Sequence, residues 1–399
     1  MDQSGAALTH GSQTATRADV LKILEKLVSF NTVSDRSNLA LQDYVQSLLQ
    51  GSGVEVMRVP NAQGDKAALY ATIGPRCDGG IVLSGHTDVV PVEGQQWSFD
   101  PFTLRVADGR AYGRGAVDMK AFLAIALALV PEMARAPLTK PIHILLSYDE
   151  ETTCLGVVDT IAKMGHDTPR PAMAIIGEPT ELDVADAHKG VTVFRTVVRG
   201  HEAHSSKPHL GAHAITGAVA FAAQCEVIAA ELRAAGDPSG RFDPAFATLH
   251  IGMMHGGQAR NILTQLCTID WEIRSVQGTD PYAVLARLDR FAADQIVPDM
   301  QKFGWPASVQ TEVLVDVPGL LPEAGSAAET LALRLAARNH TITVPFGTEA
   351  GHFQKAGLAT VVCGPGSINQ AHQPDEWIAL EELDRGLAFQ RGLIAALCA

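Results

Sequence analysis

The sequence lacks the features that mark several classes of protein. Only 19% of its 399 residues are charged and 46% are hydrophobic, a balance that excludes wholesale disorder. No run of Lys or Arg interrupts a formal net charge of −13, so nucleic acid is not expected as a partner. The longest apolar runs, such as residues 121–131, are about half of the ~20 residues that a membrane-spanning helix needs. No membrane partner is expected.

Cysteine pairs and a secretion signal are also missing. The six cysteines are scattered without a CxxC pair, which is typical of reduced, buried thiols. Residues 1–17 are rich in Ser, Thr, Ala and Gly and lack a basic start and an apolar stretch, so they predict a disordered tail rather than a signal peptide. We therefore expect a cytoplasmic protein, and the length favours two or three domains of ~150 residues.

The outer parts of the chain alternate between helix and strand patterns. Hydrophobic periodicity predicts helices, of which 18–30 and 39–49 should be amphipathic, and short apolar runs that end in polar clusters predict strands. The predicted helices cover 18–30, 39–49, 120–135 and 156–164, and the predicted strands cover 80–83, 141–146, 172–176 and 359–363. Because these strands are continuously apolar, they should be covered on both faces. The pattern predicts an α/β fold with a central, mostly parallel sheet and helices on both faces.

The middle of the chain follows a different order. Strands are predicted at 191–198, 246–253, 263–274 and 308–314, and helices at 212–232 and 281–296. The resulting βαββαβ order is that of a ferredoxin-like domain. We therefore expect an inserted lid or dimerisation domain at 190–315, which interrupts a catalytic domain made of 18–189 and 316–399.

Acidic residues and histidines fall in loops, mostly just after predicted strands. They are His86, Asp88, Asp118, Glu150, Glu151, Glu178 and His372. Up to Glu178, successive groups are separated by 27 to 33 residues, close to the ~30 residues of a βαβ unit. Because ligands bind at the carboxyl ends of the strands in open α/β sheets, we expect these side chains to lie together at one edge of the sheet.

Such a set of nitrogen and oxygen ligands suits zinc, with cobalt or manganese as substitutes. Clustered carboxylates would otherwise raise one another's pKa, whereas two divalent ions would neutralise them. Taken singly, each histidine is more often a surface or core residue, and an Asp-Glu-Glu run is usually a solvated loop or a helix start. Their joint placement on successive strand ends favours a two-metal hydrolase.

Four segments occur in the order and spacing of a known family. They are SGHTDVVP (84–91), YGRGAVDMK (112–120), DEET (149–152) and GEPT (177–180). The chain resembles the dinuclear zinc amidohydrolase family, which includes aminoacylase, succinyl-diaminopimelate desuccinylase, glutamate carboxypeptidase and acetylornithine deacetylase. The segments DAHKG (186–190), HSSKP (204–208), GTEAGHF (347–353) and GPGSINQAHQPDEW (364–377) are most similar to the acetylornithine deacetylases of that family.

The resemblance implies a ligand set for two zinc ions. Asp118 would bridge the ions, His86 and Glu178 would complete the first site, and Glu151 and His372 would complete the second. The resemblance also implies that the peptide bond after Asp118 is cis.

Further roles follow from the same resemblance. Asp88 would accept the second N–H of the His86 imidazole and orient that ring. Glu150, which is not a ligand, would be the general base that activates the metal-bridging water. His204 would stabilise the oxyanion, either in its own chain or across a dimer. An exposed loop histidine is the alternative for His204, and His201 and His209 lie near it in the sequence.

Four residues are implied to bind the substrate. Asn261 and Arg274 would hold a free α-carboxylate, although a buried structural salt bridge is the competing account of Arg274. Thr348 and Glu349 would lie near the substrate amine.

The function that the resemblance implies is hydrolysis of N2-acetyl-L-ornithine to acetate and L-ornithine. The alternative is the same chemistry on another small amide, such as N-acetyl-citrulline, N-succinyl-diaminopimelate, a dipeptide or a carboxypeptidase-like substrate. A non-catalytic receptor is disfavoured because all five ligands and the base are present. The partners expected are a small N-acyl amino acid and a second copy of the chain, bound through residues 190–315.

Overall fold

The computed structural model describes residues 14–399, and its chain divides into two compact units. Unit 1 comprises Met1–Ala187, Pro322–Ile342 and Thr348–Ala399, and unit 2 comprises His188–Leu321 and Thr343–Gly347. Residues 188–189, 316–321 and 343–347 therefore fall in unit 2, whereas the sequence analysis assigned them to the catalytic domain. Most of the tail predicted at 1–17 lies outside the described residues, and helix α1 already begins at Arg17.

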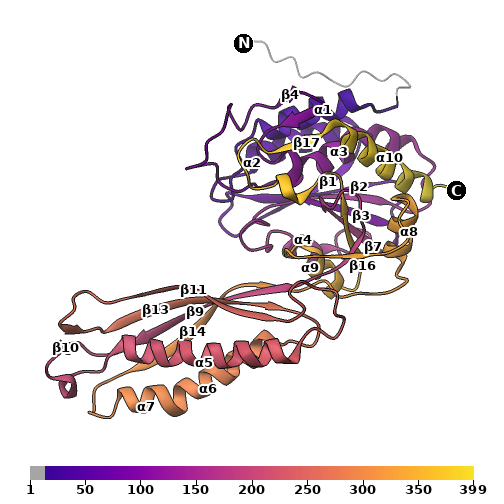
Figure 1. Ribbon diagram of the computed structural model, residues 1–399. Coiled ribbons are helices and arrows are strands. Elements are labelled where there is room, and N and C mark those ends of the chain that lie inside the picture. The colour runs from indigo at the N-terminus through magenta and orange to yellow at the C-terminus, as the bar shows by residue number, and fades with distance from the viewer. Residues whose placement is uncertain (1–13) are drawn as a thin grey trace. The chain divides into compact units, whose positions relative to one another are not determined.

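Unit 1 is built on an eight-stranded sheet, in the order β1-β2-β6-β3-β7-β16-β8-β15 (Figure 1). Its centre consists of the four predicted strands, which are parallel to one another: β6 (Ile142–Ser147), β3 (Ile81–His86), β7 (Met173–Pro179) and β16 (Ala359–Gly364). On one side β2 (Ala67–Ile73) pairs antiparallel with β6, and β1 (Glu55–Pro60) pairs antiparallel with β2; on the other side β8 (Ala185–His188) pairs antiparallel with β16, and β15 (Ile342–Val344) follows β8. The predicted mostly parallel sheet is confirmed.

Helices cover both faces of this sheet (Figure 1). One face shares the main hydrophobic core with α1 (Arg17–Val28), α2 (Leu39–Gly51), α3 (Ala121–Arg135), α8 (Ala327–Leu335) and α10 (Leu380–Ala396). The other face is covered by α4 (Val158–Lys163) and α9 (Ala350–Lys355). Residues 121–130 of α3 are all buried, which explains why this helix is apolar on every side rather than amphipathic.

A small second sheet in unit 1 brings two distant loops together. It contains β4 (Arg105–Ala107), β5 (Arg110–Tyr112) and β17 (Trp377–Ala379), with β5 in the middle. Trp377 of β17 is paired with Tyr112 of β5. The residues just after β5, which lead into the irregular turn η1 (Ala116–Lys120), therefore run beside the residues just before β17.

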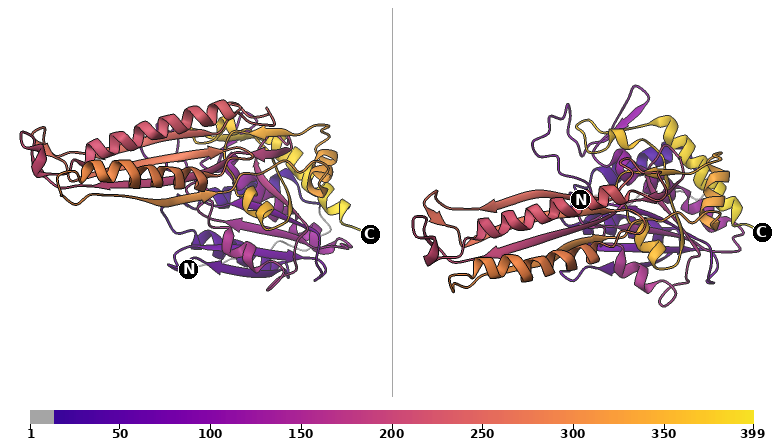
Figure 2. Two further views of the ribbon diagram at one scale, coloured as in Figure 1. Left: turned by 90° about the horizontal axis from the view of Figure 1, so that it is seen from below. Right: turned by 60° about the horizontal axis from the view of Figure 1, so that its bottom comes forward.

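Unit 2 has the predicted βαββαβ order. The four-stranded antiparallel sheet has the order β11-β13-β9-β14, and helices pack on one of its faces (Figure 2). Its core centres on Trp271, which stacks on Phe194 and donates its indole N–H to Thr196 Oγ1. The elements are β9 (Gly190–Arg199), α5 (Ala214–Ala235), β11 (Thr248–Gly256), β13 (Leu266–Ser275), α6 (Pro281–Phe291), η3 (Ala292–Ile296), α7 (Val297–Met300) and β14 (Ser308–Val317).

Helix α5 is the one helix of the described residues that is long and apolar enough to suit a membrane span. Its 18-residue window has a mean hydropathy of 1.4, and 28% of that window is buried. The helix packs on the sheet of unit 2 through Ala218, Phe221 and Cys225. Val219 and Val227 are 56% and 51% exposed. The helix therefore carries apolar side chains that unit 2 does not cover.

Candidate active site

The predicted ligands gather at the carboxyl ends of the central strands of unit 1. His86 is the last residue of β3, Glu150 and Glu151 lie in the loop after β6, and Glu178 is near the end of β7. Because β6, β3 and β7 are parallel neighbours, their ends meet at one edge of the sheet. Two further residues come from loops: Asp118 from η1, and His372 from the loop that precedes β17.

Asp118 lies between the two histidines. Its Oδ1 is 3.1 Å from His86 Nε2 and its Oδ2 is 3.2 Å from His372 Nε2. Glu151 Oε2 is 3.0 Å from the same His372 nitrogen. The two carboxylate oxygens of Asp118 thus face opposite sides, as a ligand shared by two ions would. The peptide bond between Asp118 and Met119 is cis, as the resemblance implied.

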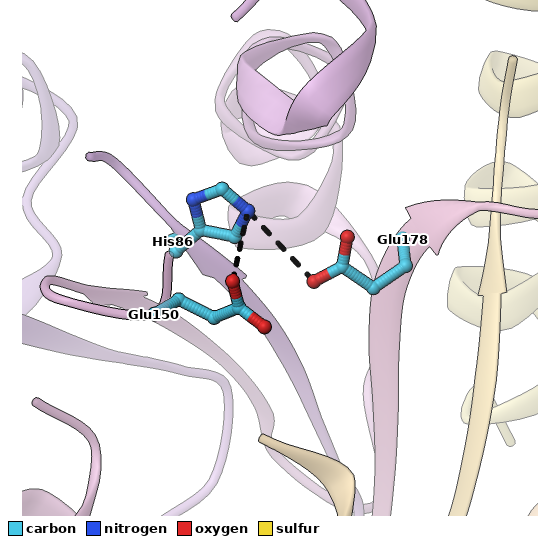
Figure 3. A group of neighbouring side chains, drawn as sticks. All are labelled: His86, Glu150 and Glu178. Carbon is cyan, nitrogen blue, oxygen red and sulfur yellow. Dashed lines mark ion pairs between the residues drawn. The ribbon is translucent and has the colours of Figure 1, made fainter. Parts of the chain in front are cut away.

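Two more carboxylates approach His86, one from the loop after β6 and one from β7 (Figure 3). Glu178 Oε1 lies 3.8 Å from His86 Nε2, and Glu150 Oε2 lies 3.9 Å from the same atom. The ligand atoms of His86, Glu150 and Glu178 lie within 4.8 Å of one another, as do those of His86, Asp118 and Glu151. These distances alone would allow Glu150 to be a ligand as readily as Glu178, so its role as a base depends on the proposal below.

Burial and mutual repulsion shift the pKa values in this cluster. Burial raises the pKa of Glu150 and Glu178 well above the usual range, and burial together with Asp118 raises that of Glu151 to about 7. Burial opposes a charge on His86 and on Asp118, but their hydrogen bond prevails: the pKa of His86 is raised and that of Asp118 is lowered. Hydrogen bonds to Asp118 and Glu151 raise the pKa of His372 to about 10.

These residues fit a pair of divalent cations. Two imidazole nitrogens and four carboxylates form the nitrogen and oxygen donor set that zinc, cobalt and manganese share. Glu178 Oε1 is buried and has no hydrogen-bond partner among residues 14–399, which is costly unless a cation binds it. Bound cations would also offset the repulsion that otherwise favours protonated carboxyl groups.

Asp88 has different contacts from those expected. The His86 Nδ1 lies 2.9 Å from the backbone carbonyl oxygen of Asp88, whereas the Asp88 carboxylate is 3.6 Å away. That carboxylate instead accepts the backbone N–H groups of Glu150 and Glu151, each at 3.2 Å, and the Ser34 hydroxyl at 2.7 Å. The main chain of Asp88 therefore orients the imidazole, and its side chain anchors the loop that carries both glutamates.

Glu349 adds a fifth carboxyl group to the buried cluster. It is 1% exposed, and its Oε2 lies 3.3 Å from the Ser84 hydroxyl of β3. Burial raises its pKa to about 7, with a hydrogen bond from Ser147 opposing the shift. Thr348, the residue before it, is also buried and accepts the backbone N–H of Ala350. Their proximity to a substrate amine stays a prediction.

The remaining predicted residues lie in unit 2. His204 is exposed, and its Nδ1 lies 2.7 Å from the Ser206 hydroxyl. It pairs with Ile262, the residue after Asn261, so His204 and Asn261 lie close together. Arg274 forms an ion pair with Glu272 at 3.0 Å, in which both side chains are partly exposed. Arg274 therefore has a salt-bridge partner, but the pair is not buried.

The sequence analysis missed several residues that support the cluster. Lys120 is fully buried and donates to the backbone carbonyls of Leu27 and Phe30, at 3.0 and 3.1 Å, where α1 ends. Arg114 and Glu376 form a buried ion pair of 2.7 Å between the loops of Asp118 and His372. Arg114, Lys120 and Glu376 lie inside the segments 112–120 and 364–377 that carry the resemblance, which was the available signal.

Solved structures share this fold. An aminopeptidase from Bacillus cereus has a TM-score of 0.72 at 20% identity, with 96% of this chain and 99% of that chain covered. A structure described as a dinuclear metal-binding peptidase of the M20 family, from Bacillus subtilis, has a TM-score of 0.64 at 16% identity, with 96% and 98% covered.

Sequence comparison is more specific. The chain is 34% identical over 386 residues to an acetylornithine deacetylase of Pasteurella multocida, covering 95% of this chain and 98% of the relative. It is 35% identical over 383 residues to an acetylornithine deacetylase of Myxococcus xanthus, covering 94% and 96%. The model of peptidase family M20/M25/M40 matches residues 82–396. The chain therefore belongs to peptidase family M20/M25/M40 and is a metal-dependent amide hydrolase.

Proposed function

We propose that the protein removes the acetyl group from N2-acetyl-L-ornithine, which yields acetate and L-ornithine. The observation that carries the chemistry is the position of Asp118, whose two carboxylate oxygens lie 3.1 and 3.2 Å from the two histidines. The choice of substrate is supported by relatives named acetylornithine deacetylase that are 33 to 35% identical over most of the chain.

Two divalent ions would be held by this cluster, zinc being our first choice and cobalt or manganese the substitutes. Asp118 would be shared, with His86 and Glu178 on one side and Glu151 and His372 on the other. When bound, the ions supply Lewis acidity, which polarises the acyl carbonyl and makes water a better nucleophile at neutral pH.

Glu150 would carry the proton. Its carboxylate takes a proton from the attacking water as the C–O bond forms, and returns it to the amide nitrogen as the C–N bond breaks. Its side chain lies beside the expected ligands, with Oε2 3.9 Å from His86 Nε2, and its backbone N–H is held by Asp88. His204 would donate a hydrogen bond to the oxyanion that develops on the carbonyl.

The rest of the substrate would be recognised by its charges. Arg274 and Asn261 would bind the α-carboxylate, and for Arg274 this requires exchange of its partner Glu272 for the substrate. Glu349, with Thr348 beside it, would favour a cationic side chain such as that of ornithine, because a buried carboxyl group is stabilised in its charged form by an opposite charge.

A homodimer through unit 2 is part of the proposal. Strand β11 lies at the edge of its sheet and carries Met253 and Met254, which are 50% and 39% exposed. The apolar side chains that α5 exposes belong to the same unit, and α5 packs against β11. An unpaired strand edge beside an exposed apolar helix face is suited to self-association, since a two-fold axis repeats both on the partner.

The positions of the substrate-binding residues within unit 2 also favour a dimer. Arg274 pairs with Val191, eight residues along β13 from the pairing of Leu266 with Arg199, a separation of roughly 26 Å. Asn261 and His204 lie beyond the Leu266 end. A small substrate cannot reach both ends of one strand. We therefore propose that Arg274 comes from one copy, and that His204 and Asn261 come from the other.

A substrate panel tests the proposed activity. We expect kcat/KM for N2-acetyl-L-ornithine to exceed by at least roughly tenfold that for N-acetyl-L-citrulline, N-succinyl-diaminopimelate and a dipeptide. N2-acetyl-L-norvaline, which keeps the chain length but lacks the amine, is the matched control for side-chain recognition. A higher kcat/KM for another compound of the panel would show that this compound is the substrate, and the proposed amide hydrolysis would stand.

Mixed dimers test the proposed partition of residues. Glu150→Gln and His204→Ala chains should each be poorly active, and a mixed dimer should regain one complete site if His204 acts across the interface. We therefore expect mixing to raise activity well above that of either parent. If subunit exchange is verified and no activity returns, His204 does not act in the partner's site.

A further inference from the structure

We propose that Gln95, Arg114 and Glu376 form a positioning cluster that sets the affinity of the His372 side of the centre for its ion. The inference rests on the two-ion centre proposed above and adds residues that do not touch the ions. Its basis is that these three side chains connect the loop of His372 to the loop of Asp118 through a chain of hydrogen bonds, which is buried at Glu376 and reaches the surface at Gln95.

Glu376 holds the Asp118 loop. Its side chain is 1% exposed, and its carboxylate accepts four hydrogen bonds. Oε1 accepts the backbone N–H groups of Val117 at 2.9 Å and of Asp118 at 3.2 Å, and Oε2 accepts that of Gly115 at 3.0 Å and the Arg114 guanidinium at 2.7 Å. A carboxylate with four donors is fully satisfied, so it defines where the backbone of Asp118 lies.

Arg114 connects Glu376 to the loop that carries Gln95. Its Nη1 bonds to Glu376, and its Nη2 donates to Gln95 Oε1 at 2.6 Å. The guanidinium also lies 5.0 Å from the centre of the Trp97 ring. Arg114 is 1% exposed. Its Nε has no hydrogen-bond partner among the described residues, so the contacts of Nη1 and Nη2 are the ones that offset the cost of burying this charge.

Gln95 makes the direct contact with His372. Its Nε2 donates to the backbone carbonyl of His372 at 2.9 Å, while its Oε1 accepts from Arg114 and from the Trp97 indole at 3.0 Å. The orientation of the Gln95 amide is thus set on both ends. His372 depends on the hydrogen bond from Gln95 for its position, because its side chain is 52% exposed and its backbone has a φ of +63°.

The two ions should depend on this cluster to different degrees. Among the residues expected to bind the ions, Gln95 contacts only His372, through its backbone carbonyl, so its loss should weaken the ion on that side. Glu376 also fixes the backbone of Asp118, which is shared, so its loss should weaken both ions. Partners behind a metal ligand typically change metal affinity by roughly 10-fold to 100-fold.

Gln95→Glu is the most informative variant. It keeps an oxygen for Arg114 and nearly the same shape, but it removes the N–H that His372 accepts. Gln95→Leu removes the same donor without adding a charge, which separates loss of the hydrogen bond from a Coulomb effect: an added negative charge alone would strengthen cation binding. Gln46→Glu, on α2 and in contact with Arg58, is the control for the added charge.

The experiment is calorimetric titration of the metal-stripped full-length protein with Zn²⁺, repeated with Co²⁺ to follow ligand geometry by its visible absorption. We expect the parent and Gln46→Glu to bind two ions. In both Gln95 variants the first Kd should be unchanged and the second should rise by roughly 10-fold to 100-fold. Two unchanged Kd values, with an unchanged cobalt spectrum, would overturn the positioning role. Fewer than two ions bound by the parent would overturn the two-ion centre instead.

Discussion

The two histidines of the site are held in opposite ways. His86 ends a central strand, is 0% exposed, and has both ring nitrogens engaged within 3.1 Å. His372 lies in a loop, and its side chain is 52% exposed. The sheet itself places the first histidine, whereas side chains from other loops place the second. A binding site can therefore combine a rigid half, made by the fold, with a half that depends on a few hydrogen bonds.

Substitution of Glu150 and Glu151 should give the largest effects, because these residues are neighbours in the chain but are assigned different roles: Glu150 as the base, and Glu151 as a ligand on the His372 side. Glu150→Gln should keep both ions and lower kcat by roughly 10²-fold to 10⁴-fold, the usual loss when a general base is removed. Glu151→Gln should lose the ion beside His372. Metal analysis and steady-state kinetics on both variants make the measurement. Loss of an ion from Glu150→Gln would show that Glu150 is a ligand rather than the general base.

Replacing each histidine in turn should have the second-largest effect. His86→Ala should abolish binding on its own side and disturb Asp118, which accepts its hydrogen bond. His372→Ala should reduce the metal content from two ions to one and leave the His86 side intact, since no strand moves. Metal analysis after dialysis against a range of free Zn²⁺ concentrations distinguishes the two. Equal losses in both variants would show that the halves bind as one unit.

The smallest effect concerns the sheet beneath His86. His143 of β6 is buried, pairs with Val82 of β3 and stacks on Tyr70. Burial lowers its pKa to about 4, while the unfolded chain has the ordinary value of ~6.5. Between these values the unfolded state binds more protons, so stability rises with pH from 4 to 6.5 and is lost on acidification. His143 should account for up to about 3 kcal/mol of the fall in the free energy of unfolding on acidification.

His143→Phe keeps the ring and removes the titration, so its free energy of unfolding should fall less between pH 6.5 and pH 4 than that of the parent. Urea unfolding at several pH values, with chelator present, measures the difference. His340→Gln, an exposed substitution, serves as the control and should follow the parent. Parallel curves for all three proteins would show that His143 does not contribute.

The central strands were predictable because they are buried on both faces, which gives runs of consecutive apolar residues. The runs at 81–86 and 142–147 are buried throughout and mostly apolar, with His143 as the one polar residue before their polar ends, and this places the following acids and histidines without further information. Strand β1, with the sequence EVMRVP, was not predicted. It is a partly exposed edge strand, so its residues carry no continuous apolar signal.

The support of the site was not predictable from local pattern. Glu376 belongs to an acidic, proline-containing segment that reads as a solvated turn, yet the pairing of β17 with β5 buries it against Arg114. Similarly, nothing near Asp88 in the sequence indicates that its carboxylate holds the loop of Glu150 and Glu151. These contacts join residues 62 to 262 positions apart, and periodicity carries no information over such separations.

Lys120 extends the site to a part of the chain that contributes no ligand. Lys120 follows Asp118 by two residues, and its ammonium group donates hydrogen bonds to the carbonyl groups at the end of α1. A shortened protein that begins after Phe30 would retain every expected metal ligand, yet it would leave the buried Lys120 amine, two residues from Asp118, without its two acceptors. Residues 17–30 contribute no ligand, yet the carbonyl groups at the end of α1 help to fix the loop of Asp118 through Lys120.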